Sequence, residues 1–286
     1  MLFRYYFFKE GSRNYEVVDL LSYFKANPYI SVIPKSEYTT VARYHNTILD
    51  FKADFILSNK SIVYGIERLN PAYIDTCLYV EFDVLSPTYD VELVINICED
   101  ICKMFNFYIY SDPFEDVCSF KKNLMIRAFE VVKRAYKQKE PKTVAEYHKA
   151  EPEVLTLVYD YLLQKNILED LLEEDKINVP KIKFYAVEGK RKVYTSIDVS
   201  ADVPFVFPTF VDMIHVLTSN GYIFISAEEF MQKTKKYFRH IESSTNNLKY
   251  VTSKEMKKIA KILTKYSFSP LILELQEVEF KKVLDI

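Results

Sequence analysis

The sequence predicts an α+β protein with two domains, each a small mixed or antiparallel sheet with helices packed on it. The first observation is length, because 286 residues exceed the roughly 100–150 residues of a typical single domain. The second is that stretches with strand-like alternation and stretches with helical spacing of apolar residues follow one another along the chain. The third is composition, since 49% hydrophobic and 27% charged residues are typical of a globular protein.

The clearest unit is a strand–helix–strand pattern from Leu78 to Tyr110. In the first strand, over 78–85, Val80 and Phe82 share one face while Glu81 and Asp83 share the other. The apolar stripe of the following helix comprises Val91, Val94, Ile95, Cys98, Ile101, Cys102 and Phe105. Because this unit sits among predicted hairpins, we expect a mixed sheet with helices on one face, ferredoxin-like in kind.

The other elements of the first half follow in chain order. An aromatic strand over 2–8 precedes a helix over 15–25, which Asn14 can cap. The next elements are a strand over 29–33, a hairpin over 39–44 and 48–57, and a short strand over 62–66. A long helix is predicted directly after Asp112-Pro113, and its stripe comprises Val117, Cys118, Leu124, Met125, Ala128, Phe129, Val132, Ala135 and Tyr136.

A polar run containing Pro141 predicts the domain boundary. We expect an N-terminal α+β domain over 1–140, a helical connector over 141–176 and a C-terminal α+β domain over 177–286. In the connector, Thr143 and Glu146 have the spacing of a capping box that starts a helix. The C-terminal domain is predicted to contain hairpins over 181–199 and 211–225, then capped helices over 226–241 and 252–266.

The sequence lacks the motifs that are typical of several classes of enzyme and nucleotide-binding protein. The four glycines stand alone, so neither a dinucleotide-binding G-x-G-x-x-G nor a phosphate-binding loop is present, and we expect no cofactor. The motifs G-x-S-x-G and H-E-x-x-H are also missing, and His215 is read as a histidine of a sheet. Cys98 and Cys102 are four residues apart but have apolar neighbours, so we expect core thiols and no metal.

Three carboxylates near the strand–helix–strand unit are the candidate catalytic residues: Glu81, Asp83 and Asp112. If the two strands were parallel neighbours, Asp83 and Asp112 would emerge at the same end, where open sheets bind ligands. Oxygen ligands of this kind suit Mg²⁺ or Mn²⁺. The alternative is that Glu81 and Asp83 lie on a solvated face of a sheet covered on one side only, and that Asp112 caps the next helix.

Charge is unevenly distributed along the chain. The C-terminal helices are basic, and the candidate binding residues there are Lys233, Lys236, Arg239, Lys257 and Lys261. The alternative is that these lysines form the solvated faces of amphipathic helices. Because the formal net charge of the whole chain is −2, we do not expect nucleic acid as a partner.

The favoured function is that of a non-enzymatic cytoplasmic protein-binding module, immunity- or inhibitor-like, with a protein partner. Its support is the lack of catalytic motifs together with 23 tyrosines, of which Tyr29, Tyr38, Tyr44 and Tyr64 lie in the N-terminal sheet region. The alternative is a metal-dependent enzyme that acts on phosphate esters through Glu81, Asp83 and Asp112. No signal peptide is recognised, and no apolar stretch approaches the roughly 20 residues of a membrane span, so no membrane association is expected.

Overall fold

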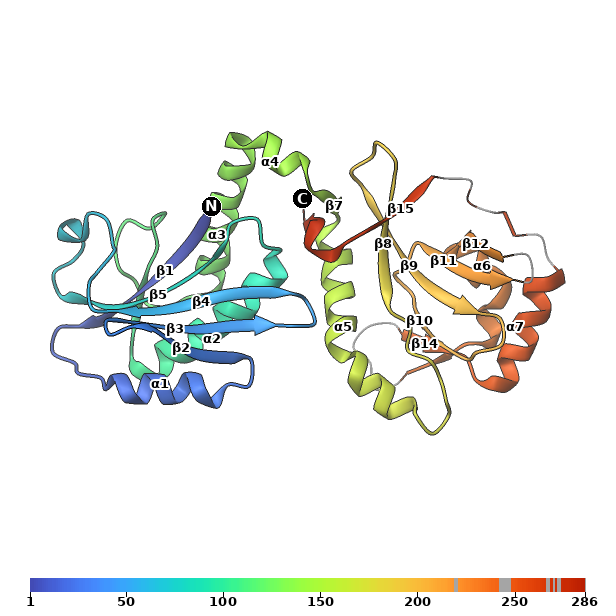
Figure 1. Ribbon diagram of the computed structural model, residues 1–286, viewed down its shortest axis with the longest axis horizontal. Coiled ribbons are helices and arrows are strands. Elements are labelled where there is room, and N and C mark those ends of the chain that lie inside the picture. Colours follow the sequence, from blue (N-terminus) through green and yellow to red (C-terminus); the bar gives the residue numbers. More distant parts are fainter. Residues whose placement is uncertain (219–220, 242–247, 266–267, 270, 272–273, 286) are drawn as a thin grey trace. The chain divides into compact units, whose positions relative to one another are not determined.

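The computed structural model of the chain describes residues 1–218, 221–241, 248–265, 268–269, 271 and 274–285. It confirms the α+β class, since helices and antiparallel sheets both contribute to each half (Figure 1). The chain divides into two compact units, Met1–Val144 and Ala145–Ile286. The predicted division into two domains and a separate connector over 141–176 stays a prediction.

The first unit is built on a six-stranded sheet in the order β2-β3-β4-β5-β1-β6, with every neighbouring pair antiparallel. The strands are β1 (Leu2–Glu10), β2 (Ile30–Ser36), β3 (Thr39–Asn46), β4 (Phe51–Ser58), β5 (Tyr73–Asp83) and β6 (Tyr108–Tyr110). The helices are α1 (Val17–Ala26), α2 (Thr88–Phe105) and α3 (Lys122–Lys139).

The strand–helix–strand unit is split by β1. Both β5 and β6 pair antiparallel with β1, so they run parallel to each other without being neighbours. The predicted pattern of strand, helix and strand is therefore confirmed, while the condition that the two strands are neighbours is not met. A ferredoxin-like description of this layer stays a prediction.

One face of this sheet packs against the three helices. Phe24 of α1 lies 5.2 Å from Phe55 of β4, measured between ring centroids, and Phe129 of α3 lies 5.7 Å from Phe82 of β5. The predicted stripe of α2 is buried apart from Phe105 at its end, which is half-buried; Val91, Val94, Ile95, Cys98 and Ile101 are fully enclosed. The helix face thus supplies the main core of the first unit.

The opposite face is covered in part, over β1 and β6, while the charged side chains Arg4 and Arg43 on the same face stay partly exposed. The loop 59–72 and the loop 111–121 lie over it and complete a second cluster, comprising Tyr6, Phe8, Val63, Leu69, Tyr110 and Val117. The aromatic alternation of β1 is the reason, because Tyr6 and Phe8 point away from the helices and need cover of their own.

Two predicted elements of the first unit are wrong. The long helix begins at Lys122, and Asp112 lies in a turn instead of capping it. In the intervening loop Cys118 exchanges backbone hydrogen bonds of 2.8 and 3.0 Å with Ile109, which extends the sheet beyond β6. The strand predicted over 62–66 is a loop, because Gly65 adopts a φ of 69° and opens a short 3-10 turn over Ile66–Arg68.

The second unit contains a five-stranded mixed sheet in the order β12-β11-β9-β8-β15. Its strands are β8 (Ile182–Val187), β9 (Val193–Ser200), β11 (Met213–Thr218), β12 (Gly221–Ser226) and β15 (Leu275–Val278), and only the β9–β11 pair is parallel. Smaller sheets join β10 (Val206–Pro208), β14 (Leu248–Tyr250) and β13 (Arg239–His240), and separately β16 (Val283–Asp285) and β7 (His148–Ala150).

The helices and connections of the second unit meet the predictions in part. Both predicted hairpins are present, although residues 219–220 of the second turn lie outside the described residues. The helices are α4 (Pro141–Ala145, at the boundary), α5 (Pro152–Leu172), α6 (Ala227–Thr234) and α7 (Ser253–Lys265). Among the described residues, no helix combines the length and apolar character that a membrane crossing requires.

Two helix boundaries in this half were predicted incorrectly. Thr143 and Glu146 do not start a helix, since α4 already includes Thr143 and β7 follows at His148. The helix predicted over 226–241 ends at Thr234 and continues as a 3-10 turn, η2 (Lys235–Tyr237), and β13. Packing explains the early end, because Phe238 contacts the rings of Phe205 and Phe207 at 5.9 and 5.5 Å.

Candidate functional site

The three candidate carboxylates lie in three different environments and have different partners. The Glu81 Oε2 atom accepts a hydrogen bond of 2.8 Å from Nε of Arg4, which lies opposite it on β1. Asp83 is exposed and accepts the backbone N–H of Leu85 at 2.7 Å. Asp112 is exposed in the loop after β6, where its charge adds to burial in raising the pKa of Tyr6 and Tyr110. Their roles as ligands or acid–base groups stay predictions.

A row of four charged side chains crosses the non-helical face of the first sheet, with two carboxylates between two guanidinium groups. Arg43 of β3 forms two hydrogen bonds of 2.7 Å with the carboxylate of Asp54 on β4. Asp54 lies opposite Glu81 on β5, which is paired with Arg4 on β1. Each carboxylate therefore has its own guanidinium, an arrangement that stabilises the ionised pairs and leaves them less suited to hold a metal.

Among the described residues, no set of three or more His, Cys, Asp or Glu side chains is placed to hold a metal ion. The four cysteines are free thiols. Burial, assisted by Cys118, raises the pKa of Cys102 to about 12, which keeps this thiol protonated and unreactive near neutral pH.

The structure separates the five candidate basic residues into two groups. Lys233 forms an ion pair of 2.7 Å with Glu229, and its Nζ atom lies 4.4 Å from the ring centroid of Phe268. Arg239 forms an ion pair of 3.2 Å with Glu255. Lys236, Lys257 and Lys261 are exposed and form no ion pair with any described residue. The pairing of Lys233 could have been predicted, since Glu229 precedes it by four residues on a helix.

Three of the four tyrosines expected in the N-terminal sheet region are exposed. Tyr64 is 87% exposed, while Tyr44 is buried at 5%. Tyr29 and Tyr38, at 51% and 59%, flank the edge strand β2. Tyr64 differs from them because it lies on the loop 59–72 between two further exposed apolar residues, Ile62 at 44% and Ile66 at 38%.

The loop 59–72 is held in place from both sides. Val63 and Leu69 are buried in the aromatic cluster on the sheet, at 8% and 9% exposure. The backbone N–H groups of Arg68 and Asn70 donate to Gly65 and to the Oδ1 atom of Asp116, at 2.9 and 3.0 Å. Inward and outward apolar residues thus alternate along an ordered loop, and sequence reasoning missed this because it took the same alternation for a strand.

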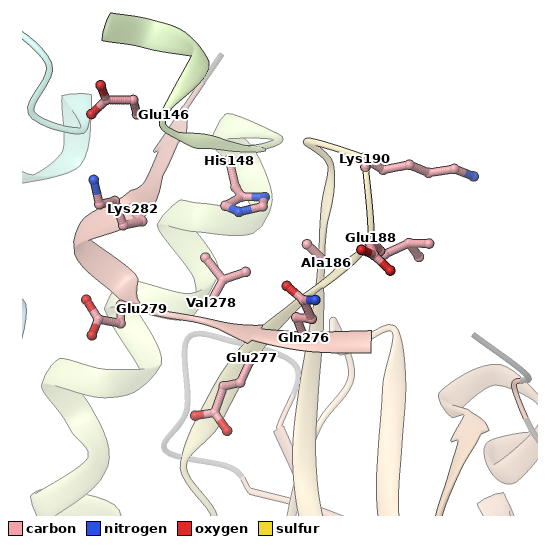
Figure 2. Close-up of a pocket in the computed structure, with 12 residues that line it drawn as sticks. Glu146, His148, Ala186, Glu188, Lys190, Gln276, Glu277, Val278, Glu279 and Lys282 are labelled. Atoms are coloured by element: carbon pink, nitrogen blue, oxygen red, sulfur yellow. The ribbon is translucent and has the colours of Figure 1, made fainter. Parts of the chain in front are cut away.

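A crevice in the second unit joins segments far apart in the sequence (Figure 2). Its volume is about 270 Å³, and its lining comes from β7, the β8–β9 turn, β15 and the short turn that follows it. His148 reaches into this region from β7, and its shielded Nδ1 atom has no hydrogen-bond partner among the described residues. The charged lining residues are Glu146, Glu188, Glu277, Glu279, Lys190 and Lys282, and Glu277 and Glu279 form ion pairs with Lys183 and Lys281.

A second hollow, of about 350 Å³, lies at the carboxyl ends of the parallel strands β9 and β11. Asp198 borders it and bonds Nδ1 of His215 at 3.0 Å and Nζ of Lys183 at 3.0 Å. The ring of His215 stacks on Phe224, with centroids 4.3 Å apart. His215 is therefore a hydrogen-bonded histidine on a sheet, as the sequence predicted, and its contact with Asp198 depends on a strand pairing that spacing alone does not reveal.

Comparison with known proteins gave no match: no family model, no curated protein and no solved structure resembles this chain.

Proposed function

We propose that this chain is a non-enzymatic protein-binding module whose first unit contacts a partner through the loop 59–72. The observation that carries the proposal is Tyr64, which is 87% exposed on a loop whose backbone and inner side chains are fixed. An apolar or aromatic side chain presented on an ordered loop gains contact area without a large entropic cost on binding. Such residues are the usual anchors of protein interfaces.

The neighbouring side chains support a protein partner. Ile62 and Ile66 extend the apolar surface on both sides of Tyr64, and the exposed Glu67 and Arg68 border it. This combination of an apolar centre and a charged margin is the composition of a protein–protein interface. An immunity- or inhibitor-like role, in which the loop covers a site on another protein, is the form of binding we propose.

The metal-dependent alternative has less support. Glu81 is already engaged by Arg4, and Asp83 accepts a backbone hydrogen bond. A cytoplasmic location remains part of the proposal, and the four free thiols support a reducing compartment.

The test is capture of the partner by the immobilised full chain, compared with the double variant Ile62→Ser/Tyr64→Ser. Because both side chains are exposed, the variant should keep the melting temperature of the parent. We expect one protein at stoichiometric yield with the parent chain and a loss of affinity of roughly 30-fold or more with the variant.

The matched control is Leu217→Ser/Tyr222→Ser, which removes one aliphatic and one tyrosine side chain at 40% and 61% exposure in the second unit. It should capture the partner as the parent does. Equal capture by the parent and the loop variant would refute the proposal, as would the recovery of no stoichiometric partner at all.

A further inference from the structure

The helix α7 presents a row of lysines to solvent. Lys254, Lys257, Lys258 and Lys261 are exposed, and their spacing places them on one face of the helix. Met256 and Ile259 on the other face are buried at 1% and 0% exposure, which fixes the orientation of the helix.

Segments that precede α7 in the sequence add to this row. The ring centroid of Tyr237 lies 5.1 Å from Nζ of Lys236 and 5.6 Å from Nζ of Lys258, so η2 and α7 bring their lysines together. Arg239 on β13 reaches α7 through its bond to Glu255. We call Lys236, Arg239, Lys254, Lys257, Lys258 and Lys261 the basic face.

Among the described residues, the positive charge of the basic face is compensated by an ion pair at Arg239 alone. Glu255 is the one acidic residue of α7, and it is engaged by Arg239 at 3.2 Å. Among the described residues, Lys254, Lys257 and Lys261 form no ion pair. Some lysines elsewhere in the chain do, as Lys103 does with Glu99 at 2.7 Å and Lys183 with Asp198 at 3.0 Å.

We propose that the basic face binds the phosphate backbone of a nucleic acid. Lysine ammonium groups act as point charges and suit contacts with phosphates that carry no sequence information. The whole-chain charge of −2 led to the opposite expectation, but that sum does not show where the charges lie. This inference concerns the second unit and is independent of the loop 59–72.

The surroundings favour nucleic acid over an acidic protein. A protein partner needs apolar or aromatic anchors at the centre of the interface. In the described parts of 227–265, no large hydrophobic side chain is among the exposed ones. Tyr237 is half-buried and engaged by the two lysines, so the face offers charge without an apolar centre.

The experiment is a fluorescence anisotropy titration of the full chain with labelled DNA duplex and labelled single-stranded RNA, each of about 20 nucleotides per strand. Four phosphate contacts on a duplex predict a slope of about −3.6 for log K against log salt. The affinity should therefore fall roughly 100-fold between about 50 and about 200 mM NaCl.

The deciding variant is Lys254→Glu/Lys257→Glu/Lys261→Glu, which should weaken binding at about 100 mM NaCl by roughly 100-fold or more. The variant Lys254→Arg/Lys257→Arg/Lys261→Arg keeps the charge and should bind as the parent does. The control Lys25→Glu/Lys35→Glu/Lys139→Glu makes the same change in net charge at exposed lysines of the first unit and should also bind as the parent does. If the first variant fails to fold, the corresponding glutamines take its place.

Three outcomes would overturn the inference. The first is no binding to either nucleic acid at about 50 mM NaCl. The second is binding that the basic-face variant and the first-unit control weaken equally, which would indicate a nonspecific effect of net charge. The third is equal competition by polyglutamate at the same charge concentration, which would indicate an acidic protein as the partner.

Discussion

Replacing Leu69 with alanine should release the loop 59–72 from the sheet. The side chain is 9% exposed and packs in the cluster with Tyr6, Phe8 and Tyr110. Leu→Ala removes about three carbon groups at ~0.8 kcal/mol each, of which about nine-tenths are buried, so the transfer part is about 2 kcal/mol. A cavity contribution brings the expected loss of unfolding free energy to about 2–3 kcal/mol.

Two measurements check this prediction. Equilibrium urea unfolding followed by far-UV circular dichroism gives the loss in free energy, with transitions of the two units fitted separately. Hydrogen exchange with mass spectrometry gives the local effect, and the amides of 59–72 should exchange faster in the variant.

The control is Ile66→Ala on the same loop, at 38% exposure, which should cost less than about 1 kcal/mol. If Leu69→Ala cost no more than this control and left the exchange of 59–72 unchanged, the loop would not be anchored as described. The argument that the anchored loop presents Tyr64 to a partner at low entropic cost would then fail as well.

Two further predictions concern titrating groups in the first unit. Burial, with Asp100 adding to it, raises the pKa of Tyr23 to about 12 from an ordinary value of 10.0. The folded state therefore keeps this proton to a higher pH than the unfolded state does. The contribution of the protonated Tyr23 to the free energy of unfolding is complete below pH 10 and is lost as the pH rises toward 12. The urea midpoint should fall over that range and fall less in Tyr23→Phe. A midpoint that is independent of pH in this window would contradict the assignment. For the thiols, iodoacetamide at about pH 8 should leave the buried Cys98 and Cys102 unmodified in the native protein and alkylate both in urea, as read by peptide mass spectrometry. Alkylation of either residue at the rate of the unfolded chain would show that the α2 face is open.

Local sequence patterns correctly predicted those strands and helices whose buried face follows from the spacing of their own apolar residues. The alternation of Val80 and Phe82 with Glu81 and Asp83 predicted β5, because successive side chains of a strand must point to opposite faces. The apolar stripe of α2 predicted its buried face, because residues spaced three and four apart lie on the same side of a helix. The prediction for 62–66 failed because a loop that packs on an aromatic face can alternate as a strand does.

The sequence identified the candidate residues by their chemical type, but it did not show which of them form ion pairs. Glu81 was recognised as a carboxylate on a strand, while its partner Arg4 lies 77 residues away. The basic residues were recognised from the lysines at 233–261. Which of them are paired depended on Glu229 and Glu255, and only the first of these lies at a spacing that indicates pairing.

By itself the sequence determined the α+β class, the buried faces of β5 and α2, and the location of the lysine-rich helices. These follow from periodicity and composition, which act over a few residues. The tertiary structure decided that β1 separates β5 from β6, that the loop 59–72 covers the aromatic face, and that Lys236 joins the lysines of α7. The physical reason is that these contacts are between segments distant in the chain, whose pairing is selected by the burial of whole faces.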